Sequence, residues 1–176
     1  MNILLQTGIR GMFLIDREAG TTIETKIVNN PCDYNKYLRD CVKQGKIKDK
    51  VRLYAGVNDR DIEKALRRFK EQMLLMDYSP ESQRNDFLFK LDKSFQHYLF
   101  QPNARKSKFF LIDIDEDSQS LFDEVMAVVD KESDTIETYK TPKGAHIVCE
   151  PFNIKHLKDL DVTVHKDGLI LLAHDK

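Results

Sequence analysis

The feature that most restricts the fold is the order of strand-like and helix-like segments in the second half of the chain. In sequence order they are the strand FFLIDID, the amphipathic helix SQSLFDEVMAVVD, the strand DTIETYKT, the strand AHIVCEPF, the short helix NIKHLKDL and the strand VTVH. This β-α-β-β-α-β order is typical of the split-βαβ or ferredoxin-like unit. Right-handed crossovers then predict the spatial strand order 4-1-3-2, with every neighbouring pair antiparallel. LILLAH (169–174), which follows a turn at KDG, is predicted to add a hairpin strand.

Residues 1–108 are predicted to form an N-terminal α/β lobe beside an RRM-like lobe at 109–176, within one compact domain. The predicted elements are short strands within 1–28, a helix from about Cys32 to Gln44, a strand at 51–57, a helix that Asn58 and Asp59 would cap, and a further helix from Pro80 to Leu99. The polar, basic segment QPNARKSK (101–108) is the expected join between the lobes. The predicted fold class is therefore α+β, with two lobes.

Composition limits the classes of partner. The chain has 176 residues, a formal net charge of -1 and 41% hydrophobic residues, so a large basic field is absent and nucleic-acid contact would need a local patch. No apolar run approaches the ~18 residues of a membrane span, so no membrane partner is expected. Three cysteines without metal-ligand spacing, and no recognisable signal peptide, predict reduced thiols in a cytoplasmic protein.

Two carboxylates lie at the end of the first strand of the second half, in FLIDIDED (110–117). Asp113 and Asp115 are two residues apart and would share one face of the strand, where like charges need solvent, protonation or a bridging cation. Mg²⁺ and Mn²⁺ prefer such oxygen ligands. The alternative is that the acids cap and complement the following helix, which explains Asp117 well, Asp115 fairly and Asp113 poorly.

A second motif, TPKGAH (141–146), precedes the third strand. A glycine-containing turn lets backbone N–H groups approach an anion, and Lys143 supplies a charge for phosphate. His146 at the start of the strand would face the same ligand. The alternative is an ordinary Pro-Lys-Gly hairpin turn with a structural histidine.

The predicted topology brings these motifs together. The first strand ends at Asp113–Asp115, and its antiparallel neighbours begin near Ala145–His146 and near Asp161–Thr163. Carboxylates, a histidine and a further Asp/Thr pair would therefore meet at one end of the sheet.

This arrangement resembles the archaeo-eukaryotic primase superfamily, which includes the primase-polymerases. The resemblance covers chiefly the second half and implies a primase-like two-lobe fold with a C-terminal RRM-like unit. It implies that Asp113 and Asp115 bind catalytic metals and that Thr141, Lys143, Gly144 and His146 contact the triphosphate of the incoming nucleotide. A third carboxylate on a later strand is also implied. Asp161 is the expected residue, and a shifted register would place Thr163 there instead, which weakens the metal site.

The expected function is metal-dependent nucleotidyl transfer of the primase or polymerase kind, with Asp113, Asp115 and His146 as catalytic residues, Asp113, Asp115 and Asp161 as metal ligands, and Mg²⁺ or Mn²⁺ as cofactor. Nucleoside triphosphates, single-stranded or primed nucleic acid and DNA-replication proteins are the expected partners. Two alternatives stay open: a catalytically inactive primase-fold protein that binds nucleic acid or another protein, and another metal-dependent phosphoryl-transfer enzyme such as a nuclease.

A group of basic residues around the junction at 51–70 has two interpretations. Arg52, together with the cations that follow it and those of 105–108, could form a local surface for a nucleic-acid backbone. Glu63 and Glu71 are interleaved with them, however, which favours a solvated helix face. Tyr54 and Tyr139 could stack on bases, although half-buried strand tyrosines are commoner.

Overall fold

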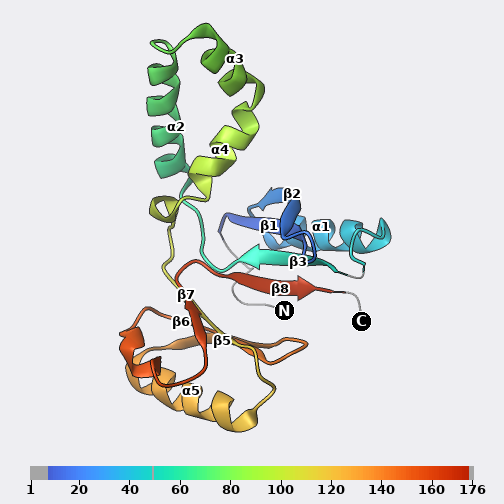
Figure 1. The fold of residues 1–176 in the computed structure, drawn as a ribbon, viewed down its shortest axis with the longest axis vertical. Coiled ribbons are helices and arrows are strands. Elements are labelled where there is room, and N and C mark those ends of the chain that lie inside the picture. Colours follow the sequence, from blue (N-terminus) through green and yellow to red (C-terminus); the bar gives the residue numbers. More distant parts are fainter. Residues whose placement is uncertain (1–7, 49, 175–176) are drawn as a thin grey trace. The chain divides into compact units, whose positions relative to one another are not determined.

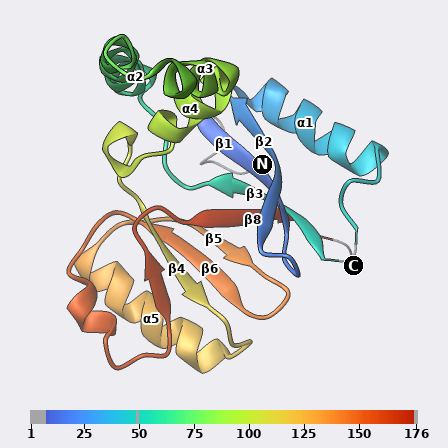
Figure 2. The same cartoon turned by 45° about the horizontal axis from the view of Figure 1, so that its top comes forward.

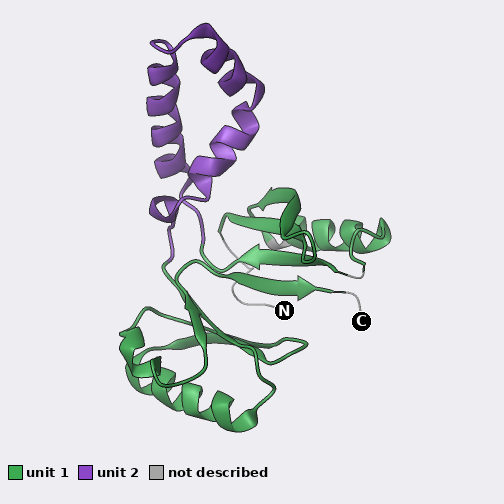
Figure 3. Cartoon of the chain, in the orientation of Figure 1, with its two compact units in different colours: residues 1–58, 108–176 green, residues 59–107 purple. Residues whose placement is uncertain are grey.

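A computed structural model describes residues 8–48 and 50–174, which form two compact units (Figure 3). The first unit consists of residues 1–58 and 108–176, and the second consists of residues 59–107. The first contains two four-stranded antiparallel sheets, which confirms the α+β class. These units differ from the expected lobes 1–108 and 109–176. The first unit takes strands from both lobes, and the second contains helices and one isolated β-bridge, between Arg60 and Arg105.

The second sheet has the predicted topology. Its elements are β4 (Phe110–Ile114), α5 (Gln119–Glu132), β5 (Thr135–Lys140), β6 (Ala145–Cys149), the 3₁₀ helix η3 (Ile154–Leu157) and β7 (Thr163–His165). The strand order is β5-β6-β4-β7 with antiparallel neighbours, which confirms the order 4-1-3-2. The predicted short helix is this single 3₁₀ turn. Side chains of α5 pack on one face of the sheet, so the opposite face is the one that carries Asp113.

The first sheet contains a strand from the far end of the chain (Figure 1). Its elements are β1 (Arg10–Asp16), β2 (Thr21–Val28), β3 (Val51–Gly56) and β8 (Leu169–Ala173), in the order β2-β1-β3-β8. The prediction that the last strand forms a hairpin with the preceding one is therefore wrong, because β8 pairs with β3.

The physical reason lies in the turn before β8. The Val57 N–H donates to the Gly168 carbonyl at 3.0 Å, which continues the β3–β8 pairing into the turn. The fully buried Asn58 amide donates to the carbonyls of Phe109 (3.1 Å) and Lys166 (3.2 Å). These bonds direct the chain away from β7. Asn58 is thus a structural link and not the predicted helix cap.

Helix α1 (Pro31–Lys43) covers one face of the first sheet (Figure 2). Asn30 caps it by accepting from the Asp33 N–H, and Gly45 follows it with a φ of 61° that favours glycine. Tyr37 and Cys41 of the helix pack against Leu53 of β3. Because side chains alternate along a strand, Arg52 and Tyr54 face the opposite side of this sheet.

The second unit consists of α2 (Ile62–Met76), α3 (Glu81–Phe89), α4 (Leu91–Leu99) and the 3₁₀ helix η2 (Pro102–Ala104). Asp61 caps α2 by accepting from the Lys64 N–H. Phe69 packs against Phe87 and Phe95, with ring centroids 5.8 and 5.6 Å away. The predicted single helix from Pro80 to Leu99 is interrupted at Lys90. None of the helices within 8–48 and 50–174 has the length and apolar character to cross a membrane.

The cysteines differ in burial, which predicts their reactivity. Cys32 is exposed, whereas Cys41 and Cys149 are buried. Burial raises the pKa of the Cys149 thiol to about 11 and also raises the pKa of Cys41. Because the thiolate is the nucleophile, iodoacetamide at about pH 8 is expected to label Cys32 alone in the native protein and all three cysteines after denaturation. Peptide mass mapping measures this, and rapid native labelling of Cys149 would contradict it.

Candidate active site

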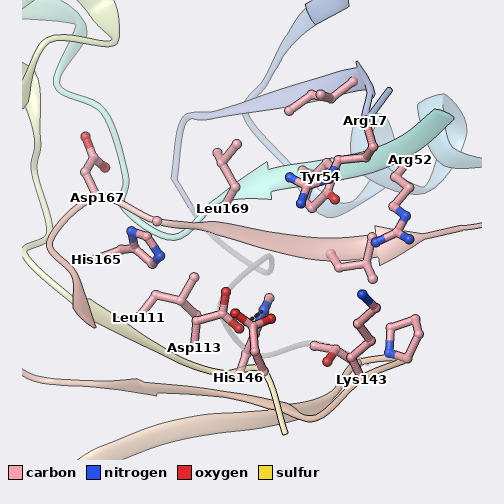
Figure 4. A pocket seen from close by; sticks show the side chains of 16 residues that line it. Arg17, Arg52, Tyr54, Leu111, Asp113, Lys143, His146, His165, Asp167 and Leu169 are labelled. Carbon is pink, nitrogen blue, oxygen red and sulfur yellow. Dashed lines mark ion pairs between the residues drawn. The ribbon is translucent and has the colours of Figure 1, made fainter. Parts of the chain in front are cut away.

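The two sheets of the first unit line one cavity of about 440 Å³ (Figure 4). One wall comes from β4, β6, β7 and the turn at 141–143, and the other comes from β1, β3 and β8 with the residues that follow β1. The first wall contributes Asp113, Asp115 and Lys143, the second contributes Arg17 and Arg52, and Asp167 lines the cavity from the turn between β7 and β8. Charges of both signs therefore face a single cavity.

The predicted carboxylate pair lines this cavity. Asp113 lies in β4, directly opposite His146 on β6 and Thr163 on β7. Asp115 is exposed just beyond the end of the strand. The structure thus brings Asp113, Asp115 and His146 together, as the strand order predicts.

His146 interacts directly with Asp113. Its Nε2 lies 3.1 Å from the Asp113 Oδ1, and the residue is only 7% exposed. Burial lowers the pKa of His146, and the Asp113 carboxylate opposes this effect. The lowered pKa indicates a neutral ring near pH 7, and this distance then assigns the proton to Nε2, which donates to Asp113. The other nitrogen, Nδ1, is buried without a hydrogen-bond partner.

Only two of the predicted nucleotide-binding residues in the turn at 141–144 line the cavity. The Thr141 N–H donates to the Gly144 carbonyl at 2.9 Å, which closes the turn, and Thr141 and Lys143 line the cavity. Gly144 is not among the lining residues and instead packs against the end of β4. A Cβ at this position would lie 3.0 Å from the Glu116 carbonyl oxygen and closer still to that of Ile114. The absence of a side chain therefore lets the turn approach the strand that carries Asp113.

The carboxylate predicted as the third metal ligand lies outside the cavity. Asp161 is exposed in a bend before β7 and is not among the residues that line the cavity. A hydrogen bond from the Val162 N–H to the Leu160 carbonyl (2.9 Å) bends the chain there, and the β4–β7 pairing begins only at Thr163. In this register Thr163, and not Asp161, lies opposite Asp113. Within the described residues, no group of three or more His, Cys, Asp or Glu side chains is placed to hold a metal ion.

Several lining residues were not expected at this site. Arg17, His165 and Asp167 were not predicted there, and Arg52 was assigned to a basic surface. The sequence could have indicated Arg52, since it is two residues from Tyr54 and shares a strand face with it. Arg17 follows β1 and reaches the cavity only through the β1–β3 pairing. The Arg52 Nε is buried without a hydrogen-bond partner. Figure 4 shows Arg52 and Lys143 pointing toward one another from opposite walls.

Comparisons of the chain with protein-family models, with curated proteins and with solved structures found no match. Functional inference therefore depends on the arrangement of this cavity.

Proposed function

We propose that the protein is a metal-dependent nucleotidyltransferase of the primase or polymerase kind, acting on nucleoside triphosphates and a nucleic-acid strand. One observation carries the proposal: Asp113 and Asp115 line the same cavity as Lys143, Arg17 and Arg52. A carboxylate pair suits divalent cations, and nearby lysine and arginine side chains suit phosphate oxygens. A nucleoside triphosphate with its cation needs both kinds of group together.

In this proposal Asp113 and Asp115 would hold Mg²⁺ or Mn²⁺, and the bound cation would supply Lewis-acid stabilisation of the negative charge of the phosphoryl group. Lys143 and Arg52 bind the phosphate chain from opposite walls. Two like charges that face each other are unfavourable alone and become favourable around an anion. The two carboxylates alone form a sparse ligand set, so water and phosphate oxygens would complete the coordination, as is usual for Mg²⁺.

The apolar part of the lining supports a nucleotide ligand. Tyr54, Leu169 and Leu171 from the first sheet and Leu111 from the second line the same cavity as the charged groups. Such side chains suit the faces of a nucleobase and a sugar, because aromatic and aliphatic groups favour flat, weakly polar surfaces. A cavity lined by both charged and apolar side chains fits a nucleotide better than inorganic phosphate.

A second candidate is an inactive member of the same fold that binds nucleic acid or another protein. The pairing of Asp113 with Thr163 in place of an acid favours it, because the metal site then has two carboxylates. Binding of nucleotide without incorporation would be the outcome that distinguishes this candidate.

Nucleotide incorporation on primed and unprimed single-stranded templates tests the proposal, with each nucleoside triphosphate and with Mn²⁺ or Mg²⁺ titrated from zero. We expect metal-dependent incorporation that EDTA abolishes. Metal and nucleotide binding without incorporation on any template would favour the second candidate. Metal-dependent cleavage of the strand without incorporation would indicate a nuclease.

The arginine on the opposite wall gives a further prediction. Arg52→Gln is expected to raise the KM for the nucleoside triphosphate roughly 10- to 100-fold, because a charge-assisted hydrogen bond contributes about 1.5–3 kcal/mol. Arg39→Gln, an exposed arginine on α1, is the matched control. Steady-state kinetics at saturating metal measure the effect. An unchanged KM in Arg52→Gln would show that Arg52 does not contact the phosphates.

A further inference from the structure

We propose that His146 is a positioning residue that fixes the Asp113 carboxylate for its cation, and that it is not a phosphate ligand. This inference rests on the proposed function in one respect, which is the assignment of Asp113 as a metal ligand. It assigns His146 a role that differs from the triphosphate contact implied by the resemblance.

The position of the His146 ring in the sheet places it beside Asp113. His146 and Asp113 are directly opposite each other on β6 and β4, so their side chains leave the sheet side by side on one face. The Nε2–Oδ1 distance of 3.1 Å is that of a hydrogen bond. The histidine is 7% exposed and therefore has little freedom to leave the contact.

Neither nitrogen of the His146 ring is open to a ligand. Nε2 is occupied by Asp113, and Nδ1 is buried without a partner. A phosphate oxygen would therefore have to displace the Asp113 carboxylate from Nε2 or reach the buried Nδ1. Lys143, by contrast, lines the same cavity with an amine that can donate to a phosphate oxygen.

The contact with His146 also orients the Asp113 carboxylate. A hydrogen bond to Oδ1 holds the Asp113 carboxylate in one orientation and leaves Oδ2 to face a cation. Partners that orient metal ligands in this way typically contribute 10- to 100-fold to metal affinity. His146 would then act before any nucleotide is present.

Amide substitutions separate the two nitrogens. Gln carries its side-chain NH₂ near the position of Nε2, whereas Asn carries it near that of Nδ1. We therefore expect His146→Gln to bind Mn²⁺ within about threefold of the wild type, and His146→Asn and His146→Leu to bind it roughly 10- to 100-fold more weakly. Electron paramagnetic resonance of free Mn²⁺, without nucleotide or nucleic acid, measures the affinity.

Thermal unfolding of each variant shows whether it is folded, and the Gln–Asn comparison remains decisive if the Leu variant unfolds. Equal Mn²⁺ affinity in all variants, rescue by Asn but not by Gln, or a Gln variant as weak as Leu would each overturn the positioning role. Mn²⁺ binding by a wild type that incorporates no nucleotide would refute the proposed function and leave this inference standing. A wild type that binds no Mn²⁺ would overturn both.

Discussion

Asp113→Asn is expected to lower metal-dependent nucleotide incorporation roughly a thousand-fold. A bound cation contributes several kcal/mol to stabilising the transition state, and each ~1.4 kcal/mol corresponds to a tenfold change in rate. Asn keeps the size of the side chain and keeps an oxygen that can accept from His146 Nε2. A lower rate would therefore result from the missing charge and metal ligand. The incorporation rate at saturating nucleotide measures this effect.

Asp117→Asn is the matched control for this variant. Asp117 is an exposed acid in the same segment, but it does not line the cavity. It precedes α5, so its loss should affect helix stability slightly and incorporation little. Equal activity in the Asp113→Asn variant and the wild type would remove Asp113 from the catalytic site, whatever its position.

Gly144→Ala is expected to destabilise the first unit by about 3 kcal/mol, because the added Cβ would overlap the carbonyl oxygen of Ile114 and crowd that of Glu116. These atoms belong to backbone at the end of β4, which cannot rotate away as a flexible side chain can. A chain of this size should lose roughly 10 °C in Tm for such a change. Thermal unfolding followed by circular dichroism measures it.

Gly56→Ala is the control, because its added Cβ would meet nothing nearer than the Gly11 carbonyl oxygen at 3.8 Å. That substitution is expected to change Tm by only a few degrees. If Gly144→Ala left both Tm and Mn²⁺ affinity unchanged, the close approach between the turn and β4 would not be a feature of the folded protein.

The sequence predicts the second sheet well because its signals are local. Alternating strands, one amphipathic helix and a glycine turn define the element order, and the handedness rule then leaves one strand order. That order places His146 beside Asp113, as the register between β4 and β6 confirms. The same reasoning does not determine where a strand starts, so the choice between Asp161 and Thr163 needed the observed bend at 160–162.

The remaining differences come from contacts between distant segments. Asn58 fits the pattern of a helix cap, but its buried amide instead donates to the carbonyls of Phe109 and Lys166, which hold it elsewhere. Arg17 follows β1. It reaches the cavity because β1 pairs with β3, and the sequence alone does not predict that pairing. The pairing of β8 with β3 joins two segments that are far apart in the sequence. Patterns of neighbouring residues carry no information on such choices.

The insertion of β8 beside β3 also affects the order in which the chain can fold. On a ribosome, β1, β2 and β3 emerge early, but Ala55 and Gly56 obtain their partners Ile170 and Leu169 only when nearly the whole described chain has been made. Closing so long a loop is slow, because its entropy must be lost before the strand contacts form. The edge of β3 would therefore stay unpaired while the second sheet folds. Chaperone dependence during synthesis would follow from the path of the chain, without any weakness in the finished core.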